Sequence, residues 1–378
     1  MLMYLCPALL DWLLYYVTFA ALYGAGLRGC SIWECTLLGI SVLVAYMPGS
    51  VAAGSILNSR NAKPILIWST VACGIASVAC LGFESFFKLI ISLGALGMAS
   101  AFFFNSFQTF MRSEPSEGMT LKHTVSFYNF AWSIGAGAGS LTAGILYTLG
   151  KGVLIGAALT SAVIVVGLLL MHKSSGEEAK NMDGVIEEGS PGARPVNGIY
   201  IIVGWMMIFM AQFVQRPLFT FLPPLFANDG VSSFMASLPL FMFLAVQAAV
   251  ALFMWKLRDH IYRRAPLLII QGLGAVAIGA IWLWPQYWNC LAMLSLLGLY
   301  SGYAFFSSIY FVSNSTRSSF NIGVNEGLVG LGSIAGILGG GLWMKSSASP
   351  SSIYLMCALG LAISALLETV VASFRKKA

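Results

Sequence analysis

The sequence predicts an all-α polytopic membrane protein, and its composition, its spacing of apolar runs and its internal repetition each support this fold class. Of its 378 residues, 58% are hydrophobic and 9% are charged, and the mean hydropathy is +0.84. A typical soluble domain has about 25% charged residues, so a water-soluble fold could not cover this much apolar surface. The 40 glycines suit membrane helices, because small residues let helix backbones approach closely.

Twelve apolar segments are long enough to be transmembrane helices, since a helix needs about 20 apolar residues to cross the hydrocarbon. An even number of spans places both chain ends on the same side of the membrane. The first span contains Asp11 and has no basic stretch before it, so it is interpreted as a retained helix and not a cleaved signal. The predicted spans are 3-24, 34-56, 64-83, 86-111, 122-148, 152-171, 198-226, 234-256, 265-284, 288-313, 320-344 and 351-373.

One polar segment, "HKSSGEEAKNMDGVIEEGSPGARPVNG", divides these spans into six and six. It is acidic and contains Gly and Pro, which is typical of a flexible linker. We therefore expect an N-terminal six-helix bundle at 1-171, a cytoplasmic linker at 172-197 and a C-terminal six-helix bundle at 198-378.

The distribution of basic residues predicts the orientation. If both termini are inside, fifteen of the 20 Lys and Arg residues fall in inner loops and the tail, four fall in outer loops, and Arg216 lies within a span. Short cytoplasmic loops collect Lys and Arg, so we expect a multi-pass protein of the inner or plasma membrane with cytoplasmic termini. The net charge of +6 then indicates attraction to anionic lipid and no nucleic-acid partner.

The remaining chemistry-bearing residues give no sign of catalysis. The seven cysteines are scattered without histidines at metal-binding spacing. The three histidines fall in or beside inner loops, and no phosphate-binding glycine loop is present. We therefore expect no enzyme activity, no metal and no cofactor.

The two halves repeat each other. A shift of 201 residues sets "LGMASAFFFNS" (96-106) on "LGLYSGYAFFS" (297-307), and "GSILNSRNAKPIL" on the loop "WKLRDHIYRRAPLL". A shift of 197 aligns three glycine pairs in the fifth and eleventh spans: Gly135 with Gly332, Gly139 with Gly336, and Gly144 with Gly341.

With these features the chain resembles the major facilitator superfamily along nearly its whole length. That family has a loop motif G-x-x-x-D-x-x-G-x-[RK], in which Gly54 and Lys63 match, Asn58 replaces Asp and Asn61 replaces Gly. Because Asn tolerates a left-handed backbone, we expect Asn61 to make the same turn. The second copy keeps acidic and basic residues in its loop. The resemblance implies two pseudo-symmetric six-helix bundles and a gating role for the loop residues Gly54, Asn58, Lys63, Asp259, Arg263 and Arg264.

The function implied by the resemblance is secondary active transport of a small organic solute by alternating access about a site at the membrane midplane. We expect a proton-coupled symporter or antiporter that acts as a monomer, with a solute, a proton or other coupling ion and the lipid bilayer as partners. The different-class alternative is a non-transporting membrane sensor or assembly scaffold, which the lost acidic charge at Asn58 favours.

Arg216, followed directly by Pro217, is the strongest candidate for a solute-binding residue. The 201 shift places Gln212 on Asp11 and Arg216 on Tyr15, and each pair lies four residues apart on one helix face. The resemblance implies that both helices line the central cavity. Pro217 leaves the carbonyl of Phe213 free and favours a kink. The alternatives are that Arg216 only pairs with Asp11, or that it extends to the interface.

Other polar residues within spans are weaker candidates. Asp11 and Glu326 are carboxylates that could carry the coupling proton, although Glu326 lies near the start of its span and could instead face interfacial water. Glu368, near the inner end of the last span, is expected at the interface. Further candidates could bind a solute or hydrogen-bond between helices, and they are Asn105, Gln108, Asn129, Trp132 and Ser307.

Overall fold

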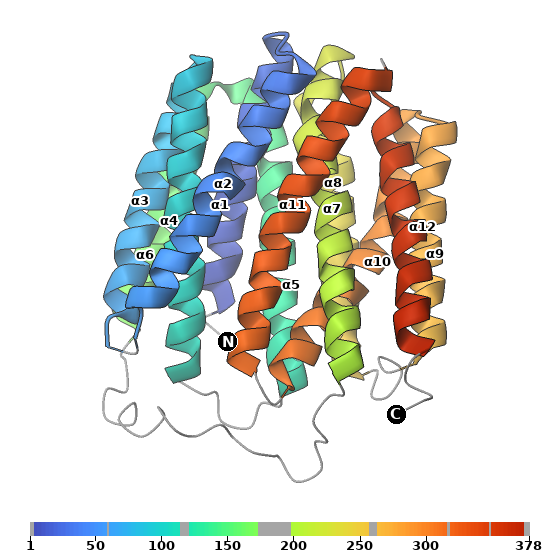
Figure 1. Ribbon diagram of the computed structural model, residues 1–378. Coiled ribbons are helices and arrows are strands. Elements are labelled where there is room, and N and C mark those ends of the chain that lie inside the picture. Colours follow the sequence, from blue (N-terminus) through green and yellow to red (C-terminus); the bar gives the residue numbers. More distant parts are fainter. Residues whose placement is uncertain are drawn as a thin grey trace.

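The computed structural model describes residues 4–58, 60–113, 121–172, 198–256, 263–315, 318–347 and 349–373, and this part of the chain is helical (Figure 1). Two short 3-10 helices, Tyr147–Leu149 and Met254–Lys256, extend α5 and α8. The α-helices are α1 (Leu5–Leu27), α2 (Ile32–Ile56), α3 (Ala62–Gly82), α4 (Phe86–Ser113), α5 (Leu121–Leu146), α6 (Lys151–Met171), α7 (Gly198–Asn228), α8 (Ser233–Phe253), α9 (Arg264–Leu283), α10 (Tyr287–Ser313), α11 (Ser318–Ser347) and α12 (Ser352–Ser373).

These helices confirm the predicted fold class, and each one coincides with a predicted span. Eleven are long and apolar enough to cross a membrane, while α5, rich in Gly and Ser, falls below that limit. The chain is an integral, multi-pass membrane protein. α1 begins and α12 ends at the same end of the bundle, which we call the terminal face; the other end is the far face (Figure 1).

The repeat seen in the sequence recurs as repeated packing. A Cβ added to Gly97 of α4 would lie 2.0 Å from the carbonyl oxygen of Val42 in α2. A Cβ on Gly298 of α10 would lie 2.5 Å from the carbonyl oxygen of Phe243 in α8. Both glycines and both carbonyls are related by the shift of 201. Each half therefore packs its second helix on its fourth through the same glycine contact.

The glycines of α5 and α11 make a second set of matched contacts. A Cβ on Gly139 would lie 2.1 Å from the carbonyl oxygen of Trp12, and one on Gly336 would lie 2.3 Å from that of Phe213. Trp12 and Phe213 are again 201 residues apart. Only glycine permits this approach, so α5 rests on α1 as α11 rests on α7. The carbonyl of Phe213 is the one that Pro217 leaves free, and α7 runs unbroken through this proline.

The turns that end α1 and α7 are also copies. Gly29 has φ 70° and Gly230 has φ 73°, a left-handed conformation that costs glycine little. Two residues later, Ser31 and Ser232 cap the N-termini of α2 and α8 through their side chains. The same backbone turn and the same cap thus position the second helix of each half.

The two halves meet closely at the far face. A Cβ on Gly341 of α11 would lie 2.3 Å from Oγ1 of Thr36 in α2, and one on Gly144 of α5 would lie 2.2 Å from Oγ of Ser237 in α8. The Tyr23 hydroxyl of α1 donates to the carbonyl of Val231 (2.8 Å). α5 and α8 also contact each other away from this face, where the amide of Gln247 donates to the Ser133 hydroxyl (2.8 Å). The halves are therefore joined at the far face by α1, α2 and α5 on one side and by the segment 228–233, α8 and α11 on the other.

The predicted turn between α2 and α3 forms differently from the expectation. Asn61 has φ −100° and is not left-handed, so the expectation of a glycine-like backbone there is wrong. Side-chain hydrogen bonds make the turn instead. Asn58 Oδ1 accepts from the backbone N–H of Asn61 (3.0 Å), and Asn61 Oδ1 accepts from that of Asn58 (2.8 Å). Uncharged amides can thus replace the acid and the glycine of the family motif.

The other loop residues with an expected gating role are placed only in part. Lys63 donates to the carbonyl of His172 and so ties the α2–α3 turn to the end of α6. Gly54 is exposed with open space around it. Arg263 is exposed directly before α9, and Arg264 begins that helix. Asp259 and the linker 173–197 lie outside the described residues.

On the far face, one ion pair links two loops of the N-terminal half. Lys151 at the start of α6 pairs with Glu84 between α3 and α4. The hydrogen bond and charge of Lys151 lower the pKa of the Glu84 carboxyl below its usual value. Both side chains are exposed, so the pair contributes little to stability.

Candidate functional site

A cavity lies between the two halves and contains the residue pair singled out by the repeat. It holds about 140 Å³ of water-accessible space, well above the roughly 10–15 Å³ that one water needs. α1, α2, α4 and α5 form one wall, and α7, α8 and α11 form the other. The lining residues are Asp11, Leu14, Tyr15, Thr18, Phe19, Gly39, Val42, Leu43, Tyr46, Ser100, Phe104, Ser140, Arg216, Phe219, Thr220, Leu240, Val329, Gly330 and Ile337.

Arg216 enters the cavity from α7 and is held on two sides. Its Nε donates to Oε1 of Gln212, one helical turn earlier (3.0 Å), and its guanidinium carbon lies 5.6 Å from the ring centroid of Tyr15 on α1. Cation–π attraction at such a distance stabilises a cation. Oε1 of Gln212 also lies 3.0 Å from the Ser333 hydroxyl of α11, which shares its proton with the carbonyl of Val329 in its own helix (2.6 Å). Three helices therefore fix the position of this charge.

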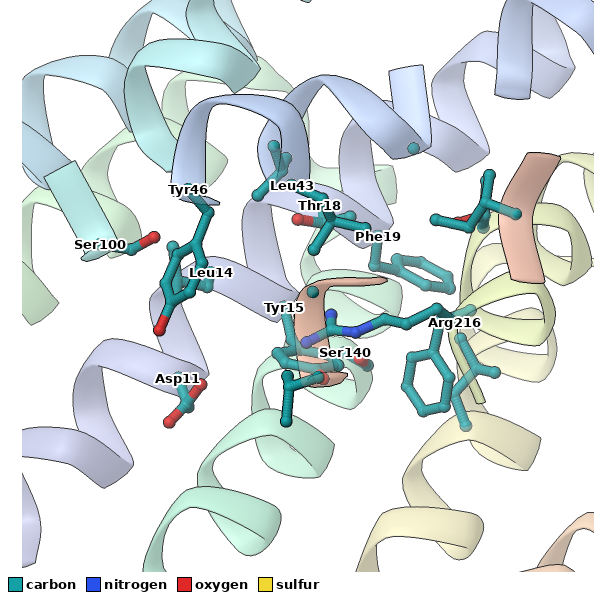
Figure 2. A pocket seen from close by; sticks show the side chains of 18 of the residues that line it. Asp11, Leu14, Tyr15, Thr18, Phe19, Leu43, Tyr46, Ser100, Ser140 and Arg216 are labelled. Carbon is teal, nitrogen blue, oxygen red and sulfur yellow. The ribbon is translucent and has the colours of Figure 1, made fainter. Parts of the chain in front are cut away.

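Asp11 approaches the cavity from the opposite side (Figure 2). Its side chain is only 7% exposed, yet no ion pair within 4.0 Å joins it to Arg216, since Lys151–Glu84 is the pair found among the described residues. The two charges interact only at longer range. The expectation that they share a cavity is therefore met, while the alternative of a direct pair between them finds no support in the geometry.

Tyr46 of α2 interacts electrostatically with the central charges and with the second candidate carboxylate. It lines the cavity and lies within electrostatic range of Asp11, Arg216 and Glu326. Tyr128 of α5 likewise lies within electrostatic range of both Glu326 and Asp11. Glu326 is half-buried and is not part of the cavity wall. Two tyrosines are thus within electrostatic range of both the α1 and the α11 carboxylate.

Several predicted candidates lie outside the cavity wall. Asn105 bonds the carbonyl of Ala101 in its own helix (2.8 Å), and Gln108 hydrogen-bonds Tyr128. Asn129 is wholly buried and accepts from the indole N–H of Trp132 (3.1 Å).

Trp132 packs against Phe305 of the other half, with ring centroids 4.9 Å apart. Ser307 is buried in α10. In the present arrangement Trp132 packs across the two halves, while Asn105 and Asn129 donate to carbonyls of their own helices. Contact of all five candidates with solute remains a prediction.

Sequence reasoning missed several polar residues of the site. Tyr46, Ser140 and Thr220 line the cavity, but each sits in an apolar run without a charge to mark it. The repeat contained one usable signal, because the 201 shift pairs Tyr46 with Gln247. Gln247 bridges the halves: its amide donates to Ser133 of α5 (2.8 Å).

Glu368 corrects a further expectation. It was expected at the membrane interface, but its exposed fraction is 0%. The Ser364 hydroxyl, one turn earlier in α12, donates to its Oε1 (2.8 Å). α12 turns this residue towards α10, where it lies within electrostatic range of Tyr300 and Tyr303. A position near a helix end therefore did not imply exposure.

Comparisons with known proteins agree with this architecture. No protein-family model matches the sequence. A search of curated proteins also found no match. Among solved structures, the chain is similar to the crystal structure of a D-xylose-proton symporter, with a TM-score of 0.69 and 17% sequence identity over 96% of this chain and 95% of that one. That symporter is a member of the major facilitator superfamily. With twelve helices, doubled packing contacts and a cavity between the halves, the chain has the major facilitator fold.

Proposed function

We propose that the protein is a secondary active transporter that moves a small organic solute across the membrane by alternating access, coupled to protons. The observation that carries this proposal is a cavity between two repeated halves into which two opposite, unpaired charges project, Asp11 from one half and Arg216 from the other. An unpaired charge within a membrane is costly and usually functional. The likeness to a proton-coupled symporter supports the same function.

The finer parts of the proposal concern setting and partners. The protein works as a monomer in the inner or plasma membrane, with both termini cytoplasmic and residues 172-197 as the linker between two bundles, 1-171 and 198-378. It needs no metal, cofactor or nucleic acid and performs no catalytic reaction. Gating involves the α2–α3 turn and the loop before α9.

Transport can be tested without knowing the solute. Purified protein is reconstituted in liposomes that contain a pH-sensitive dye, and pools of sugars, amino acids and organic acids are added outside. We expect at least one pool to evoke proton movement that protein-free liposomes lack. The non-transporting sensor or scaffold remains the second candidate, and it predicts that no pool moves either protons or labelled solute although some pool binds.

Replacing the candidate proton carriers should uncouple transport. In Asp11→Asn and Glu326→Gln, we expect at least one variant to lose gradient-driven accumulation and to keep passive exchange, because an amide cannot carry the proton. Accumulation and exchange of the active pool are measured in the same liposomes. Glu84→Gln, on the exposed far face, is the matched control. If both amide variants still concentrate solute, neither carboxylate is the proton carrier, and a uniporter becomes the better proposal.

The orientation has its own test. A cysteine introduced as Ser175→Cys in the linker should react with a membrane-impermeant maleimide in inside-out vesicles but not in intact cells. The parent protein is the control, because six of its seven cysteines are buried and Cys30 is half-exposed at the far face. Labelling of the introduced cysteine from outside intact cells would reverse the proposed topology.

A further inference from the structure

The guanidinium of Arg216 is a preorganised site for an anion. Nε donates to Gln212 and the ring of Tyr15 lies against the guanidinium, while the two terminal nitrogens, Nη1 and Nη2, have no hydrogen-bond partner among the described residues. One N–H of each terminal nitrogen together form the planar fork that binds a carboxylate through two parallel bonds. Because Gln212 is held by Ser333, little side-chain entropy is lost when an anion binds.

Beside the charge, the wall offers apolar surface to the body of a solute. Phe19, Phe219 and Ile337 contribute apolar surface to the cavity. The hydroxyls of Ser100 and Ser140 already donate to carbonyls of their own helices, Gly97 (2.8 Å) and Ala136 (3.3 Å). These two hydroxyl protons are therefore used within the protein, and the remaining lining hydroxyls belong to Tyr15, Thr18, Tyr46 and Thr220.

The number of charges limits the charge of the solute. Among the lining residues, Arg216 is the cationic side chain and Asp11 the anionic one. One guanidinium can neutralise one negative charge, whereas a dianionic phosphate would leave a charge uncompensated in the cavity. The site therefore fits a monoanion.

Proton binding at Asp11 then follows from the same geometry. An ionised Asp11 repels an anion bound at Arg216 and partly neutralises the positive charge that attracts it. A protonated Asp11 has neither effect. Proton and anion therefore favour each other's binding, and this coupling is reciprocal. The groups that face Asp11 are Tyr15 of its own helix, Tyr46 of α2, Tyr128 of α5 and Arg216 of α7, with Glu326 of α11 acting on Tyr46 and Tyr128.

We infer that the solute is a small organic monocarboxylate with an apolar body, bound by the terminal nitrogens of Arg216 and carried together with a proton on Asp11. This inference rests on the proposed function and names its solute class. It makes proton-monocarboxylate transport electroneutral, because the proton offsets the charge of the anion.

The test measures binding by titration calorimetry to the purified full-length protein. The probes are propanoate, benzoate and 3-phenylpropanoate, with 3-phenylpropan-1-ol as a neutral analogue and phenylalanine as a zwitterion. We expect at least one carboxylate to bind, to bind tighter than the alcohol, and to weaken about tenfold between pH 5.5 and pH 8, within the usual range of coupling between two sites. Because carboxylates such as these are ionised at both pH values, the change reports on the protein.

Variants assign the two roles. Arg216→Gln should reduce carboxylate affinity at least tenfold at both pH values, whereas Arg28→Gln, an exposed arginine at the end of α1, should not. Asp11→Asn should remove the pH dependence. Thermal stability without probe is measured for each variant, and Arg216→Lys serves if Arg216→Gln does not fold.

Four outcomes would overturn the inference. They are tighter binding of phenylalanine than of 3-phenylpropanoate, binding of no carboxylate, carboxylate affinity that survives in both Arg216 variants, and a pH dependence that follows Glu326→Gln instead of Asp11→Asn. Failure here is distinguishable from failure of the proposed function. If a sugar or amino-acid pool moves protons in liposomes while no carboxylate binds, the protein is a transporter of another solute class.

Discussion

Removing both central charges together, as Asp11→Asn with Arg216→Gln, is expected to leave solute-evoked proton movement abolished while thermal stability stays close to that of the parent protein. The reason is that the two side chains do not form an ion pair within 4.0 Å. Loss of activity in either single variant therefore does not arise from leaving the other residue as an unpaired charge. If the residues only neutralised each other, the double variant would leave no unpaired ion and activity would return.

Arg216→Lys refines this test, because it keeps the charge and removes the planar fork. We expect about a tenfold or greater loss of apparent solute affinity, which corresponds to about 1.4 kcal/mol or more, with normal folding. The measurements are proton movement in liposomes and the melting temperature of each purified variant. Recovery in the double variant would show that Arg216 has a structural role only.

Adding one methyl group at Gly139 or Gly336 is expected to be strongly destabilising. In Gly139→Ala and Gly336→Ala, the new Cβ would lie 2.1 Å and 2.3 Å from a backbone carbonyl oxygen, so the neighbouring helix must move away. Overpacking of this kind costs about 1–3 kcal/mol or more, and here no flexible side chain can yield. We expect lower melting temperatures and a smaller monodisperse fraction in detergent.

The matched controls are Gly156→Ala in α6 and Gly279→Ala in α9, where an added Cβ meets nothing within 4 Å. These should be neutral or slightly stabilising, since alanine is the better helix former. Equal melting temperatures for all four variants would show that the close contacts of α5 on α1 and of α11 on α7 do not limit stability.

Much of the fold was predictable because it depends on properties that lie along the chain. The length of each apolar run determines whether it can cross the membrane, and the repeat relates one half to the other. The alignment of Asp11 with Gln212 and of Tyr15 with Arg216 was enough to place these residues near one another, because matched helices occupy matched positions. The spacing of Gly135, a residue whose added Cβ would lie 2.0 Å from the carbonyl of Ala8, likewise indicated close packing.

What could not be predicted depends on the rotation of each helix about its axis. A transmembrane helix is apolar on every side, so hydropathy does not show which side meets protein and which meets lipid. This is why Tyr46 was overlooked and why Glu368, predicted at the interface, is wholly buried. The turn at Asn58 and Asn61 was misjudged for another reason: side-chain hydrogen bonds replaced a backbone conformation.

The change of shift between the two halves has a consequence for how the chain can vary in length. Helices α4 and α10 begin 201 residues apart, whereas α5 and α11 begin 197 apart, so the stretch from the start of α4 to the start of α5 is four residues longer than its copy in the C-terminal half. The glycines of α5 and α11 nevertheless meet equivalent carbonyls. The glycine contacts of α4 and α10 and those of α5 and α11 are therefore conserved between the halves although the chain between them differs in length. The two copies have thus diverged by insertion or deletion between the start of α4 and the start of α5, and the chain length between these helices can change without loss of the contacts on either side.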